Sequence, residues 1–87
     1  MKVAVWDTYV KRKDGRVMNF DILVPADEMN EERIFTFGKD YLQSKNEAGQ
    51  ILSANECRFC HVEQATNEMI ASIQQKGYYI VEMNNCK

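Results

Sequence analysis

The first 25 residues contain two runs with the alternation of a β-hairpin. Residues 3–10 are rich in β-branched and aromatic side chains, which favour a strand. In residues 17–24 every second position is apolar: Met18, Phe20, Ile22 and Val24. The Asp14-Gly15 pair between the two runs predicts a tight turn.

Two turn geometries fit this pair, and they place opposite faces of the first strand against the core. A two-residue turn would set Asp7 opposite Ile22, on the core side. A three-residue turn, Lys13 to Gly15 with Gly15 left-handed, sets Asp7 opposite Asp21 instead. We predict the second turn, because it keeps a carboxylate out of the core. The other face then carries apolar residues that another element or a second subunit should cover: Val3, Val5, Tyr9 and Leu23.

Two helices are predicted after the hairpin. Apolar residues at helical spacing indicate a helix over about residues 29–44, with Asp27 or Asn30 as its N-cap. A second helix is expected between Thr66, which can cap its start, and Gly77, which ends it.

Two more strands complete the pattern. Residues 57–63 and 78–83 are predicted strands, and Ile51-Leu52-Ser53 is a candidate strand start. The order ββαβαβ predicts one domain over residues 1–87, of α/β class with an α+β-like two-layer form. We expect a four-stranded mixed sheet with both helices packed on one face. The last strand–helix–strand unit should form a right-handed parallel crossover.

Composition narrows the class of protein. The net charge of −2, with charges of both signs interspersed, argues against a nucleic-acid binder. No apolar run approaches the roughly 18 residues of a membrane helix, and residues 1–7 hold too short an apolar stretch for a signal peptide. We therefore expect a soluble, cytoplasmic protein with no nucleic-acid or membrane partner.

Candidate chemistry is concentrated in residues 56–63, which hold two of the three cysteines and the only histidine. The spacing Cys57-x-x-Cys60-His61 occurs in c-type haem attachment, zinc sites and thiol-redox motifs. Regular strand alternation would place Cys57 and His61 on one face and Cys60 on the other, so the ligands would diverge. Cys86 could supply a fourth ligand if the last strand lay beside this one. The candidate metal ligands are therefore Cys57, Cys60, His61 and Cys86.

We weigh four interpretations of this cluster. Covalent haem would need export and a large apolar pocket, and redox activation would need a helix N-terminus at Cys57. Zinc would need all four candidate ligands to converge. We favour the fourth interpretation, in which the cysteines pack as small buried residues and His61 pairs with Glu63 or Asp7. It requires no cofactor.

Several stretches of the sequence are similar to one known bacterial family. They are Val5-Trp6-Asp7-Thr8-Tyr9-Val10-Lys11, Lys13-Asp14-Gly15, Val17-Met18, Phe20-Asp21, Glu56-Cys57-Arg58-Phe59-Cys60-His61 and Gly77-Tyr78-Tyr79-Ile80 to Met83 with Cys86. On these stretches the chain resembles domain-of-unknown-function family 2024, and its Cys-Arg-Phe-Cys-His run is quite specific. The resemblance implies a small α/β domain. It implies no activity, so no functional residue is carried over.

Our functional prediction is a non-enzymatic binding or structural module of unassigned role, forming a two-fold dimer through the outer sheet face. The alternative is a small zinc- or thiol-based protein that uses Cys57, Cys60, His61 and Cys86. An enzyme with His61 and a nearby carboxylate as acid–base groups is the third interpretation, and Asp7 with Asp21 is a further candidate pair. The sequence identifies no small-molecule ligand.

Overall fold

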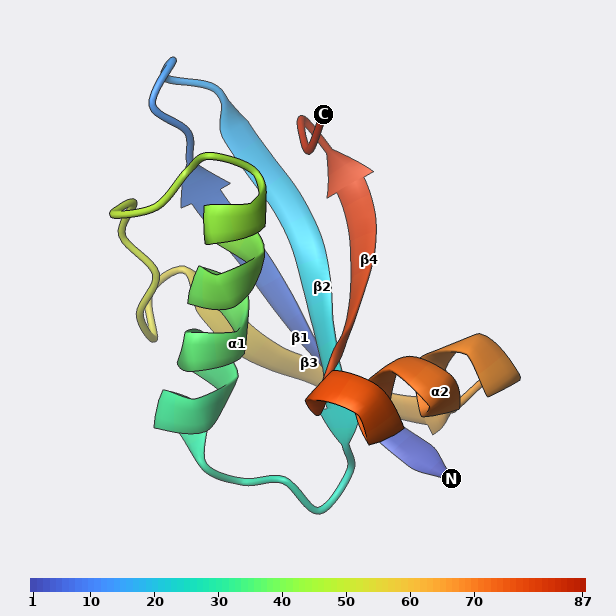
Figure 1. The fold of residues 1–87 in the computed structure, drawn as a ribbon. Helices are drawn as coiled ribbons and strands as arrows, with labels where there is room; N and C mark the ends of the chain where they lie inside the picture. The colour runs from blue at the N-terminus through green and yellow to red at the C-terminus, as the bar shows by residue number, and fades with distance from the viewer.

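The elements follow the predicted order in the computed structural model, which describes residues 1–87 (Figure 1). They are β1 (Lys2–Lys11), β2 (Val17–Pro25), α1 (Glu31–Ser44), β3 (Cys57–Gln64), α2 (Asn67–Lys76) and β4 (Tyr79–Asn84). Asn30 caps α1 and Thr66 caps α2, since each side chain accepts a backbone N–H of the first turn. Gly77 ends α2 with a left-handed φ of 93°. Neither helix is long and apolar enough to cross a membrane.

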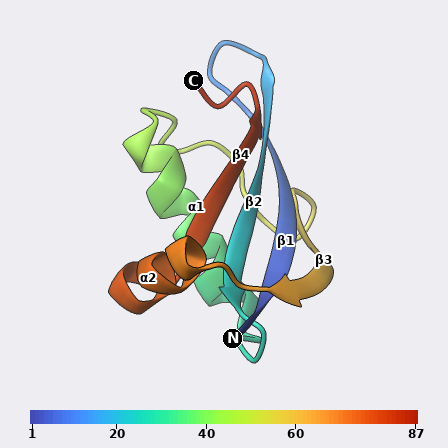
Figure 2. The ribbon, with the colours of Figure 1, turned by 90° about the vertical axis from the view of Figure 1, so that its right-hand side faces the viewer.

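The sheet has the strand order β3-β1-β2-β4, and every neighbouring pair is antiparallel. Figure 2 shows β3 and β4 at opposite edges of the sheet. The α+β class with four strands is confirmed, whereas the predicted mixed sheet and parallel crossover are wrong. The reason is that the β1–β2 hairpin occupies the centre and each of its open edges receives one later strand.

The hairpin has the predicted three-residue register. Asp7 lies opposite Asp21, and Gly15 is left-handed with a φ of 92°. Asp14 accepts the backbone N–H of Arg16 at 3.0 Å, which fixes the turn. This register turns alternate apolar residues of both strands toward α1.

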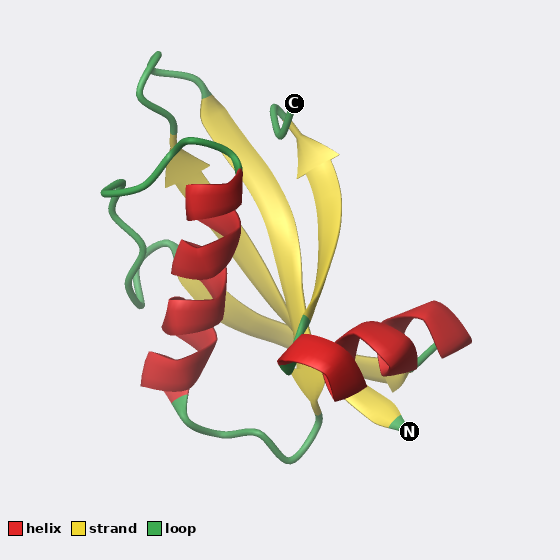
Figure 3. Ribbon diagram, in the orientation of Figure 1, coloured by secondary structure: helices red, strands yellow, loops and turns green.

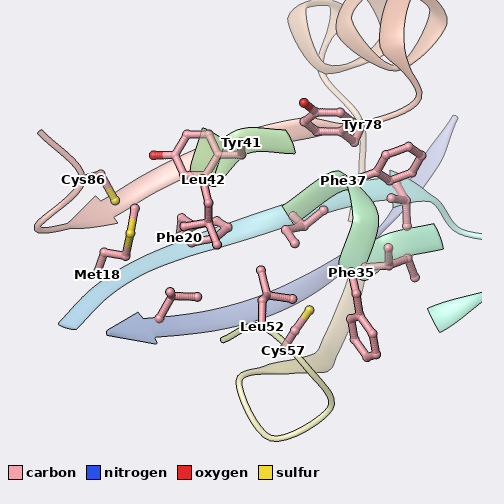
Figure 4. Packing of buried hydrophobic residues seen from close by; sticks show 14 of the residues in the cluster. Met18, Phe20, Phe35, Phe37, Tyr41, Leu42, Leu52, Cys57, Tyr78 and Cys86 are labelled. Atoms are coloured by element: carbon pink, nitrogen blue, oxygen red, sulfur yellow. The ribbon is translucent and has the colours of Figure 1, made fainter. Parts of the chain in front are cut away.

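Helix α1 covers one face of the sheet and forms the larger core (Figure 4). The backbone of α1 lies close to core side chains at Gly38, where an added Cβ would be 2.5 Å from Leu52 Cδ1 and 3.0 Å from Ile22 Cδ1. The candidate strand at residues 51–53 is a loop instead. Its Leu52 is buried and completes the core between α1 and the sheet.

Helix α2 lies against the other face, so the prediction that both helices pack on one face is wrong. Figure 3 shows α1 at the left of the strands and α2 at their lower right, and the two helices pack into separate cores on opposite faces of the sheet. Ile73 of α2 packs with Val3, Val5 and Leu23, which are at most 2 % exposed. Tyr9, the fourth residue that suggested a dimer, stays 52 % exposed, whereas the chain's own helix covers the other three. The dimer remains a prediction, but these three residues are not free to form its interface.

Candidate functional site at the β3 edge

A β-bulge in β3 determines how the candidate residues lie. Val5 of β1 pairs with His61, but the next residue, Trp6, pairs with Phe59. Cys60 is therefore the extra residue of the bulge. Ahead of the bulge, Phe59 packs beside Trp6 on the α1 side, with ring centroids 5.8 Å apart. After it, His61 shares the opposite face with Val5, so the predicted alternation through the whole strand is wrong.

The bulge brings together two neighbours that a regular strand would separate. His61 Nδ1 lies 3.2 Å from Cys60 Sγ, and His61 Nε2 lies 3.1 Å from Glu63 Oε2. An imidazole protonated at Nε2 donates to the carboxylate and leaves Nδ1 free to accept the thiol proton. The side chains are open to solvent, since His61 is 50 % exposed and Glu63 is 42 % exposed. The thiol contacts a base, and a carboxylate orients that base. This is the usual arrangement for activating a nucleophile.

The other two cysteines lie elsewhere. Cys57 is 1 % exposed in the α1 core, and burial raises the pKa of its thiol. Cys86 is 4 % exposed, and its Sγ donates to the carbonyl of Asn19 at 3.2 Å. Figure 4 shows Cys57 beside Leu52 and Cys86 on the far side of the core. The predicted burial is confirmed for Cys57 and wrong for Cys60, which is exposed, and Cys86 is buried as well.

The four predicted metal ligands are therefore not brought together. The bulge separates Cys57 from His61, and Cys86 follows β4 at the opposite edge of the sheet. No group of three or more His, Cys, Asp and Glu side chains converges within the chain. Only Cys60 and His61 remain as a pair that could share one ion.

Two carboxyl groups lie on the same face as His61, on the half that α2 leaves open. Asp7 and Asp21 face each other across β1 and β2. Burial, the charge of Asp7 and a hydrogen bond to Asp7 raise the pKa of Asp21, and only nearby His61 opposes them. Asn19 donates to Asp7 Oδ1 at 3.0 Å. The predicted like-charge pair is confirmed, and it borders the Cys60–His61 pair.

A separate polar network, which periodicity and motifs do not predict, lines the cleft between the two helices and β4. Tyr41 of α1 donates to Glu82 of β4, and Lys45 Nζ lies 2.7 Å from the same carboxylate. Hydrogen bonds from Lys45 and Tyr41 lower the pKa of Glu82. The cleft has a volume of about 370 Å³. Tyr41 and Lys45 both pair with Glu82, whereas the Cys60–His61 pair is exposed, so we assign the candidate site to the β3 edge.

Comparison with known proteins agrees with the resemblance seen in the sequence. A family model described as "Domain of unknown function (DUF2024)" matches residues 1–83. No curated protein matches the chain. The NMR structure of protein NE1680 from Nitrosomonas europaea is 44 % identical, each chain covers 100 % of the other, and the TM-score is 0.86.

Proposed function

The chain belongs to the family described as a domain of unknown function (DUF2024), and we propose that it is a non-enzymatic thiol module whose working group is Cys60. The observation that supports this proposal most directly is the contact of Cys60 Sγ with His61 Nδ1, with Glu63 holding the other ring nitrogen. We place the module in the cytoplasm, where Cys60 would be kept reduced between reactions.

The reaction that suits this geometry is exchange with a disulfide. His61 Nδ1 accepts the proton of the Cys60 thiol, and the thiolate attacks one sulfur of the partner disulfide. The partner's S–S bond breaks as the new S–S bond forms, and the second sulfur leaves as a thiolate. That thiolate takes the proton back from the imidazolium. The products are a mixed disulfide on Cys60 and one free thiol.

The positions of the remaining cysteines support a stoichiometric rather than a catalytic role. Release of the bound group would need a second thiol close to Cys60. Cys57 is buried on the α1 side, and Cys86 is buried beyond β2. A mixed disulfide on Cys60 would therefore persist until an external thiol removed it.

The carboxyl pair Asp7 and Asp21, next to the Cys60–His61 pair, also supports the proposed thiol function. Like charges directly opposite each other in a sheet lower stability, and Asp7 with Asp21 is such a pair. Local features that lower stability are commonly found at functional sites. In this proposal the pair gives the surface around Cys60 a negative potential that would select among disulfide partners.

Incubation of the reduced, metal-free protein with cystamine, a cationic disulfide that a negative surface would attract, tests the proposal. We expect one adduct per chain in the intact mass, located on Cys60 by peptide mapping and removed by dithiothreitol. Cys60→Ser should abolish the adduct, whereas the matched variant Cys86→Ser should keep it. Absence of an adduct on the folded protein, or equal labelling of all three cysteines, would contradict the proposal.

A further inference from the structure

The Cys60–His61 pair has the geometry of half a zinc site. Tetrahedral zinc binds sulfur at about 2.3 Å and nitrogen at about 2.0–2.1 Å, which sets the two ligand atoms about 3.5 Å apart. Cys60 Sγ and His61 Nδ1 are 3.2 Å apart, so a small side-chain adjustment would let both bind one ion. We propose that two copies of the chain join edge to edge through β3 and together hold one zinc ion.

The carboxylate of Glu63 supports the metal-binding orientation of the imidazole. Glu63 Oε2 lies 3.1 Å from His61 Nε2 and can accept its proton, which leaves Nδ1 for the metal. Zinc-binding histidines regularly donate their second N–H to a carboxylate in this way. No third ligating side chain converges on the pair within one chain. A closed tetrahedral site therefore needs two ligands from another molecule.

The β3 edge offers a place where a second copy can supply them. β3 pairs only with β1, so its outer edge has no partner strand (Figure 2). Phe59 is 54 % exposed and Val62 is 46 % exposed along this strand. An exposed, partly apolar edge strand is prone to pair with another strand.

The sequence of β3 is complementary to itself in the antiparallel direction. A two-fold axis between Cys60 and His61 sets each Cys60 opposite the other copy's His61. The same register sets Arg58 opposite the other copy's Glu63, and Phe59 opposite Val62. Arg58 has no ion pair in its own chain, so it is free to meet the second carboxylate. Opposite charges and apolar side chains in facing positions both favour strand pairing.

This symmetry also completes the metal site. Cys60 Sγ and His61 Nδ1 lie together in one chain, and the axis brings the second pair beside the first. Two thiolates and two imidazoles are a common ligand set of structural zinc. The interface is isologous, because the same strand supplies both sides. The resulting dimer would have one zinc for every two chains and a continuous eight-stranded sheet.

Zinc titration with mass measurement tests this inference. Chelator-treated protein is titrated with zinc chloride, while calorimetry gives the stoichiometry and light scattering gives the mass. We expect saturation at one zinc per two chains and a rise in mass from 10.1 kDa to twice that value. Cys60→Ser and His61→Asn should each abolish both effects, whereas Cys86→Ser should retain them.

Charge reversal tests the strand register separately. Arg58→Glu should weaken the dimer by setting two carboxylates opposite each other, and Arg58→Lys should preserve it. One zinc per chain without a mass increase, a monomer at saturating zinc, or a dimer that forms equally with chelator would each overturn the inference. The cystamine test uses metal-free protein, so it can succeed or fail independently of this one.

Discussion

Replacing Asp21 by asparagine tests the electrostatics of the open sheet face. Asp21 is partly buried directly opposite Asp7, and both burial and the Asp7 charge raise the pKa of Asp21. Asparagine keeps the shape and can still donate a hydrogen bond to Asp7, but it carries no charge. We therefore expect Asp21→Asn to stabilise the protein near pH 7.

The size of the gain follows from the position of the pair. Cross-strand pairs contribute roughly 0.2–1 kcal/mol, and solvent screening of the open face reduces the repulsion, so we expect about 0.5 kcal/mol. For a domain of this length, that corresponds to a rise in Tm of about 2–4 °C.

The stability gain from Asp21→Asn should depend on pH. Because the folded-state pKa of Asp21 lies above the usual 3.8, the folded state holds its proton more tightly than the unfolded chain. The protonated carboxyl therefore contributes stability at low pH, and this contribution is lost as the pH rises through the folded-state pKa. The advantage of Asp21→Asn should appear above that pKa and vanish by about pH 3.

Urea denaturation of wild type and variant at pH 3, 5 and 7 measures the difference directly. The exposed helix residue Asp40, which has no ion pair, provides the matched control Asp40→Asn. No gain at pH 7, or a gain that persists unchanged at pH 3, would refute the electrostatic explanation.

Two further predictions concern packing and an ion pair away from the candidate site. Gly38→Ala should lower the free energy of unfolding by about 1–2 kcal/mol, because the new Cβ would meet the buried Leu52 Cδ1 at 2.5 Å and this cost exceeds the gain of about 1 kcal/mol in helix propensity; urea denaturation checks this, and an unchanged midpoint would refute it. Glu47→Gln should lower the Tm at pH 7, because the Glu47 carboxylate accepts the Lys13 N–H and pairs with Arg12, which lowers its pKa. The stability that Glu47 contributes through its lowered pKa is lost as the pH falls through that pKa. The Tm of Glu47→Gln should therefore approach the wild-type Tm once the pH drops below the usual carboxyl pKa of 4.5.

The local pattern of the chain was sufficient to predict most of its elements. Hydrophobic alternation and the Asp14-Gly15 turn determined the hairpin register, because only one register keeps Asp7 off the core. Capping chemistry at Thr66 and Gly77 marked α2. Which edge β4 joins depends on where α2 packs. That packing is set by a few contacts of Ile73 with Val3, Val5 and Leu23, which periodicity alone does not specify.

The candidate site was located by its residue types but not by its geometry. The cysteine–histidine run drew attention to the right strand, and the pairing of His61 with Glu63 is confirmed. The bulge at Cys60 was missed, because nothing in the run distinguishes it from a regular strand. One extra residue there reverses the faces of all later side chains. It brings Cys60 to His61 and leaves Cys57 in the core.

The rate of Cys60 alkylation tests most directly whether the bulge makes Cys60 and His61 act as a pair. An unassisted thiol with a pKa of about 8.5 is only about 3 % ionised at pH 7, which leaves room for roughly tenfold acceleration by a neighbouring base. Reaction with iodoacetamide should be about tenfold slower in His61→Asn than in wild type at pH 7, and equally fast at pH 10. Equal rates at both pH values would contradict the account.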